Sequence, residues 1–159
     1  MKAYTFVHSY VCGIQVGIQA GHALVELMNQ DEDPGQPHTS QWASHHKTFV
    51  WLDGGGSSSM LDLVDNIADS RLVFASFRES EMMSNPDDPL DDGMLTAVSV
   101  VLPTEYCDIA DSIRMDRLRL TYDDGCTMFV DSEGKVVYSL PMALGNVIWK
   151  VANSGLKRV

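Results

Sequence analysis

The stretch YTFVHSYVCGIQVGIQAGHALVEL, residues 4–27, decides how the predicted fold begins. Its first part, 4–11, is rich in β-branched and aromatic side chains, which favours a strand. Apolar residues recur every three or four positions over 13–27, which predicts a helix directly after that strand. Gly17 and Gly21 make a groove on this helix that a neighbouring backbone can approach closely. One helical face is lined by the apolar residues Ile14, Ile18, Val25 and Met28.

Polar side chains interrupt the same helix at a regular spacing. They are Gln15, Gln19, His22 and Glu26, separated by four, three and four residues. This step keeps side chains on one face of a helix. The stripe is open to two interpretations, the solvated side of a core helix or one wall of an active site.

Strands and helices alternate in the next part of the chain. Further strands are predicted at 47–52, 72–77 and 95–102, and helices over 60–68 and 104–115. The strand at 47–52 is continuously apolar, which suggests burial on both faces, as in a parallel sheet. A serine of DGGGSSS is the expected N-cap of the helix over 60–68. This order indicates an α/β fold on a mostly parallel or mixed sheet.

The remaining segments are predicted as surface loops and a β-rich tail. Proline, glycine and acidic residues at 29–40 and 84–93 predict loops at the surface. After residue 116 the patterns indicate short strands at 118–122, 127–130 and 136–140 and a helix over 145–154.

Charge and composition restrict the partners. The chain of 159 residues has the size of one domain, and its formal net charge is −11, with 22 acids against 11 bases. Non-specific nucleic-acid binding needs a basic surface, so a tRNA partner would need a local patch. Arg117 and Arg119 are the candidates for such a patch, although pairing with nearby carboxylates would explain them equally well.

The sequence predicts neither a membrane segment nor a cofactor. No apolar run approaches the roughly 18 residues of a membrane span, and the first thirteen residues resemble a strand more than a secretory signal, which favours the cytoplasm. Cys12, Cys107 and Cys126 are too far apart to indicate a disulfide framework or a zinc site, so we expect buried free thiols. His38, His45 and His46 fit an exposed loop better than a metal site.

Several short motifs occur in a characteristic order. Gln19-Ala20-Gly21-His22-Ala23 follows the first strand, Trp42 and Lys47 precede the second, and a strand that begins near Thr96-Ala97-Val98 ends at Pro103. Together they resemble the archaeal and eukaryotic type of peptidyl-tRNA hydrolase, over roughly 4–115. The resemblance implies a mixed four-stranded sheet flanked by helices over residues 1–116. Residues 117–159 would then be a C-terminal β-rich extension packed on the same domain.

The resemblance also implies an activity and the residues that perform it. Members of that family hydrolyse the ester between a peptide and the terminal ribose of tRNA, and they are often dimers. Such hydrolysis needs a base, donors for the oxyanion and a group that holds the base. On this basis His22 is the candidate base, Lys47 the positive charge, Thr96 and Gln19 the donors, and Glu79 the orienting acid. Gln15 stands where the family has a lysine, and Gln15 and Gln19 are candidate substrate-binding residues.

Each assignment has a structural alternative. His22 could be a hydrogen-bonded histidine between helix and sheet, Lys47 could extend to water, and Glu79 could pair with Arg78 at the surface. DGGGSSS could hold a phosphate or simply connect two elements. For the whole protein, two further functions are a catalytically inactive member of the fold that binds a nucleotide, tRNA or protein, and an acidic protein-interaction module.

Overall fold

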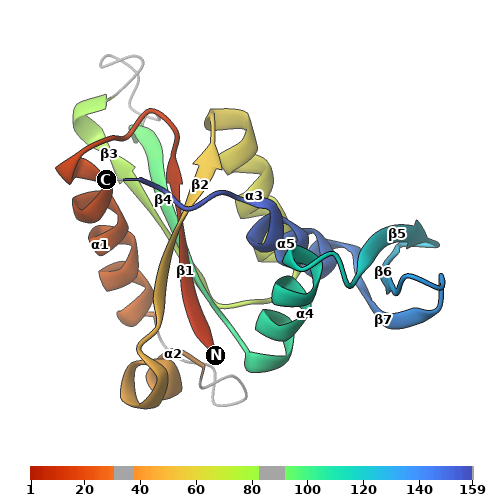
Figure 1. The fold of residues 1–159 in the computed structure, drawn as a ribbon. Helices are drawn as coiled ribbons and strands as arrows, with labels where there is room; N and C mark the ends of the chain where they lie inside the picture. Colours follow the sequence, from red (N-terminus) through yellow and green to blue (C-terminus); the bar gives the residue numbers. More distant parts are fainter. Residues whose placement is uncertain (31–37, 83–91, 159) are drawn as a thin grey trace.

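The computed structural model describes residues 1–30, 38–82 and 92–158 (Figure 1). Most of the two expected surface loops, 29–40 and 84–93, lies outside these ranges. The chain contains a four-stranded sheet with helices on both of its faces and a second, three-stranded sheet near the C-terminus. The expected α/β fold with a mixed four-stranded sheet and a later β-rich segment is therefore confirmed.

The main sheet is mixed. Its strands are β1 (Lys2–His8), β2 (Phe49–Gly55), β3 (Phe74–Glu79) and β4 (Met94–Leu102), in the order β2-β1-β4-β3. β1 runs parallel to β2, whereas β4 runs antiparallel to both β1 and β3. The carboxyl ends of β1, β2 and β3 and the amino end of β4 therefore meet at one end of the sheet.

β2 corrects the expectation of a strand buried on both faces. It lies at the edge of the sheet, and Phe49, Val50 and Trp51 are only partly buried. The chain terminus covers part of this edge, since the Asp53 amide donates to the carbonyl of Gly155 at 2.9 Å. An antiparallel bridge also joins Leu52 to Leu156. Edge strands need such cover because their backbone groups are otherwise unpaired.

One face of the main sheet is covered by α1 (Ile14–Met28), followed by α2 (His38–Gln41) and the π-helical turn η1 (Trp42–His46). α1 places Val16, Gln19, Ala20, Ala23 and Leu27 on the sheet. Small alanines at two of these positions let the helix lie close to the strands. The other apolar face, which carries Ile14, Ile18, Val25 and Met28, points away from the sheet and is exposed.

The opposite face is covered by α3 (Ser57–Asp69), α4 (Thr104–Arg114) and α5 (Met142–Asn153), which enclose the larger hydrophobic core. α3 begins earlier than expected, and its N-cap is Gly56 instead of a serine. Because Gly54 and Gly55 already belong to β2, the glycine-rich stretch is a strand end joined directly to a helix.

The C-terminal sheet consists of β5 (Arg119–Asp123), β6 (Cys126–Val130) and β7 (Val136–Pro141), all antiparallel. The short 3-10 turn η2 (Ser80–Met82) is not part of it and directly follows β3. α5 lies against β6 so closely that a Cβ atom on Gly145 would overlap the side chain of Thr127. Phe129 belongs to the same core cluster as Phe6 of the main sheet. The two sheets thus share one core through α5.

The thiols differ in exposure. Cys107 is buried, as expected, but Cys12 is exposed and Cys126 is half-buried. The expectation that all three are buried was therefore wrong, because Cys12 lies in the turn between β1 and α1. Within the described parts of the chain, no helix has the length and apolar character that crossing a bilayer requires.

Candidate functional site

Gln19 links α1 to the end of the sheet where β1 finishes. Its side chain is 2% exposed. Its Nε2 donates to Oε2 of Glu79 on β3 at 2.9 Å, and its Oε1 accepts a hydrogen bond from the Thr96 hydroxyl on β4 at 2.6 Å. A buried amide is costly unless both of its ends are paired, and here both are. The three residues form a continuous polar chain, Thr96–Gln19–Glu79.

A β-bulge turns Thr96 toward this chain. Ala97 pairs with Phe77 and Leu95 with Arg78, so Thr96 has no partner residue in β3. The Thr96 hydroxyl also lies 3.3 Å from the Phe77 carbonyl oxygen. Bulges direct a side chain away from the regular alternation and are frequent beside active sites.

His22 lies beside the chain on the solvent side. It follows Gln19 by three residues, so both side chains share one side of α1. The imidazole is exposed, and its centroid is 4.4 Å from that of the Phe77 ring. Phe77 precedes Glu79 by two residues on β3. The structure therefore brings together four of the predicted site residues, His22, Gln19, Thr96 and Glu79.

Lys47 lies at the other end of the sheet. It is exposed, has a left-handed φ of 53° and follows η1. Near it Ala3 of β1 pairs with Phe49, whereas Val7 of the same strand pairs with Ala97 beside Thr96. These two positions on β1 are about 13 Å apart at the usual rise of a strand. Lys47 is thus not assembled with the Gln19 chain.

Of the remaining predicted binding residues, one lies near the Thr96–Gln19–Glu79 chain and two lie far from it. Gln15 is exposed on α1, one turn before Gln19. Arg117 and Arg119 are also exposed, but Arg117 lies between α4 and β5 and Arg119 is the first residue of β5, beyond the opposite face of the main sheet (Figure 1). Phosphates bound by these arginines would belong to a part of tRNA far from His22.

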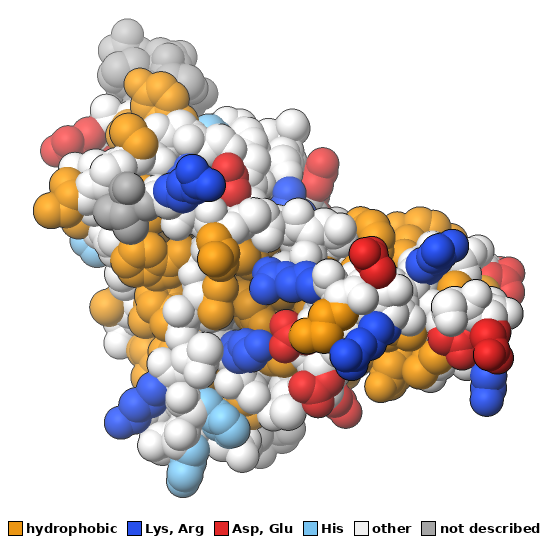
Figure 2. Space-filling model, in the orientation of Figure 1, with side chains coloured by type: hydrophobic (Ala, Val, Ile, Leu, Met, Phe, Trp, Pro, Cys, Tyr) orange, Lys and Arg blue, Asp and Glu red, His pale blue; other side chains and the backbone are white. Residues whose placement is uncertain are grey.

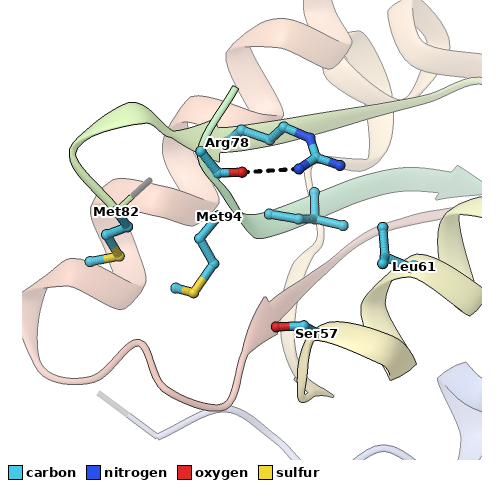
Figure 3. A pocket seen from close by; sticks show the side chains of 7 residues that line it. Ser57, Leu61, Arg78, Met82 and Met94 are labelled. Atoms are coloured by element: carbon cyan, nitrogen blue, oxygen red, sulfur yellow. Dashed lines mark hydrogen bonds between the residues drawn. The ribbon is translucent and has the colours of Figure 1, made fainter. Parts of the chain in front are cut away.

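Arg78 does not form the surface pair with Glu79 that the sequence allows. Its guanidinium lies 3.3 Å from Asp92 and donates to the Gly93 carbonyl at 3.0 Å. A hollow of about 270 Å³ lies on the α3 side. Figure 3 shows Arg78, Ser57, Leu61 and Met94 around it. The lining is mostly apolar, which suits the apolar part of a ligand.

His8, at the end of β1, was not predicted as a site residue. Its Nδ1 accepts the Tyr10 amide at 3.0 Å, so the neutral ring carries its proton on Nε2, which lies 3.2 Å from the Ser57 hydroxyl. Nε2 then donates to Ser57 and cannot take its proton. The pair is therefore no activated serine nucleophile. The one sequence signal was a polar residue that interrupts the first apolar strand.

Burial lowers the pKa of His8 below its ordinary value of 6.5, and Lys157 adds to this effect while Asp53 opposes it. As the pH falls, the His8 imidazole is therefore protonated in the unfolded chain before it is protonated in the folded protein. The neutral His8 ring therefore stabilises the folded state fully above the pKa that His8 has in the unfolded chain. This stabilisation is lost as the pH falls through the lower pKa that His8 has in the folded state. We expect wild type to lose more free energy of unfolding than His8→Asn between about pH 7.5 and about pH 5.5, measured by urea denaturation. Equal losses in the two proteins would contradict the assignment.

Asp53 fixes the end of β2. It accepts the Ser9 hydroxyl at 2.7 Å and the Gly55 amide at 3.0 Å. Burial alone would raise the pKa of Asp53, but these hydrogen bonds and the charges of Lys157 and Lys150 outweigh it and hold the pKa below its usual value. The glycine-serine stretch is thus fixed by internal contacts.

No metal centre is assembled by the residues that the structure describes, since no group of three or more His, Cys, Asp or Glu side chains is placed to hold an ion. His45 and His46 are exposed in η1. The sequence matches no protein-family model and no curated protein. The functional argument therefore depends on the geometry of the Thr96–Gln19–Glu79 chain and His22.

Proposed function

We propose that this protein is a peptidyl-tRNA hydrolase-like esterase, which cleaves the ester between a peptide and the terminal ribose of tRNA. The proposal is carried by one observation, the bulge-directed chain Thr96–Gln19–Glu79 beside the exposed imidazole of His22. An acid, an amide, a hydroxyl and a base from α1, β3 and β4 then stand together at one end of the sheet.

The proposed reaction is attack of water on the ester carbonyl carbon. His22 positions the water and accepts its proton, and the ribose oxygen leaves with a proton returned from the imidazolium. Glu79, held by Gln19, supplies a negative charge on the same side as the imidazolium that forms. The exposed amide of Gln15 is the donor available to the oxyanion, one turn before Gln19.

The proposal includes the cellular setting that this substrate requires. The partner is tRNA, met in the cytoplasm, and the protein acts as a homodimer. With a net charge of −11, contact with tRNA must be local and sensitive to salt. Arg117 and Arg119 are the proposed phosphate contacts, at a distance from the ester.

The direct test is hydrolysis of N-blocked aminoacyl-tRNA by the purified protein. Release of the blocked amino acid above the uncatalysed rate supports the proposal. A folded protein that releases none at any concentration tested removes it and leaves the binding alternatives.

A catalytically inactive member of the fold, which binds a nucleotide, tRNA or a protein, is the second candidate. It is favoured by the internal use of the polar groups, since Thr96 donates to Gln19 and Gln19 to Glu79. Lys47 is also remote from them. A purely binding protein would need neither a free donor nor a nearby cation. An acidic interaction module, the third candidate, predicts a basic protein partner and no affinity for tRNA.

Gln15→Lys separates the first two candidates. A cation at this exposed position would lie beside the ester, and the rate of hydrolysis should rise by about 10-fold or more, since single oxyanion donors are worth roughly 100-fold. Gln41→Lys, which adds the same charge at an exposed position of α2, is the matched control and should leave the rate unchanged. If Gln15→Lys and wild type are equally inactive while folded, the chain is a binder.

A further inference from the structure

The outer face of α1 carries a row of apolar side chains that no element of the described chain covers. Ile14 is 76%, Ile18 40%, Val25 58% and Met28 42% exposed. This row, with Gly21 at its centre, is called the α1 stripe below. Figure 2 shows hydrophobic side chains reaching the surface on this side of the molecule. Apolar rows of this kind on a folded domain usually mark a binding surface.

The spacing of the α1 stripe fits a second helix. Its members follow one another by four, three, four and three residues, which is the pattern of a helix–helix seam. The row is also nearly symmetrical about Gly21. Ile14 and Met28 lie seven residues from it, and Ile18 and Val25 lie three and four residues from it. A surface that is symmetrical in this way can pair with itself about a two-fold axis.

Among the described residues of one copy, no close neighbour requires a glycine at position 21. A Cβ atom at this position would meet nothing within 4 Å, and glycine weakens a helix interior relative to alanine. The missing side chain instead permits close approach of another backbone. It lies at the centre of the row, where two crossing helices would be nearest to each other.

The charges of α1 also favour a second copy. In a protein with a net charge of −11, two copies repel unless the contact avoids acids. Glu26 is the one acidic residue of α1, and it lies on the flank of the stripe. With the helices antiparallel about Gly21, Glu26 of one copy lies on the same flank as the neutral Gln15 of the other, so the contact sets no acid against an acid.

We propose that the α1 stripe is the interface of a homodimer in which two α1 helices pack antiparallel about a two-fold axis near Gly21. Ile14 then meets Met28 of the second copy, and Ile18 meets its Val25. His22 lies on the flank of this contact and remains open to solvent. The inference identifies the surface of the proposed homodimer and is independent of the hydrolytic activity, because its test measures only association.

The test is the oligomeric state of matched variants by sedimentation. Wild type should be a dimer, whereas Ile18→Glu and Val25→Lys should each be monomeric, with a Kd raised at least about 100-fold, because each buries a charge without a partner. Mixing the two should restore a dimer, since the carboxylate introduced in one chain then faces the ammonium introduced in the other, while the second contact stays isoleucine against valine. Leu61→Glu, on the exposed part of α3, is the control and should remain dimeric.

Cross-linking tests the position of the axis. In a Cys12→Ser background, which removes the exposed thiol, Gly21→Cys should form a disulfide-linked dimer, and Leu61→Cys should not. Circular dichroism confirms that each variant is folded. A monomeric wild type, a dimeric Ile18→Glu, or failure of the two charged variants to pair would overturn the proposal. A monomeric wild type would assign the stripe to a different partner.

Discussion

Replacing His22 by alanine should lower the rate of hydrolysis of N-blocked aminoacyl-tRNA by about 100-fold or more, the usual contribution of a general base. The imidazole is the one side chain of the four assembled at the site that is exposed, whereas Gln19 and Thr96 are buried, and Thr96 donates to Gln19 while Gln19 donates to Glu79. Water can therefore reach His22 while the other three hold its surroundings. Binding of tRNA should change little, since the ring does not need to contact phosphate.

The controls separate loss of chemistry from loss of structure. An exposed side chain contributes little to stability, so His22→Ala should unfold within about 0.5 kcal/mol of wild type. His46→Ala removes another exposed histidine at the remote end of the sheet, in η1, and should keep full activity. Hydrolysis that persists unchanged in His22→Ala would show that the base lies elsewhere.

α1 shows what periodicity can and cannot predict. The sequence pattern identifies the helix to within one residue, because both of its apolar rows have helical spacing. One row, Val16, Ala20, Ala23 and Leu27, is buried, and the other is exposed. Spacing alone does not predict which of the two rows is buried against the sheet. The choice depends on how closely small residues let the helix approach the sheet, which is a property of the tertiary packing.

The site was partly predictable for a related reason. Gln19 and His22 belong to one helix, so their common side follows from spacing. The contacts of Gln19 with Glu79 and Thr96 cross 60 and 77 residues of sequence, and the contact with Thr96 depends on a bulge that no local pattern predicts. Lys47 was predicted as part of a strand, but the strand begins at Phe49 and runs away from it toward the site.

Replacing Phe129 by alanine should lower the free energy of unfolding by about 3–5 kcal/mol, the usual cost of removing a buried phenylalanine. Phe129 is 0% exposed and lies in the same cluster as Phe6 of β1 and Ile148 of α5. Although it belongs to the C-terminal sheet, its loss leaves a cavity in the core that supports the main sheet. The stability of the whole chain should fall, since a small domain has only about 5–15 kcal/mol in total.

Two probes test whether the two sheets unfold together. In a Trp51→Phe, Trp149→Phe background, Trp42 is the single tryptophan and reports on the α1 side of the main sheet. Phe129→Ala should shift its fluorescence transition in urea as much as the circular dichroism transition. Tyr138→Ala, which alters the exposed cross-strand neighbour of Phe129, should cost no more than about 1 kcal/mol. If the Trp42 transition stays in place while the C-terminal sheet melts, residues 117–159 are an independent unit, and the core shared through α5 contributes little to the stability of the main sheet.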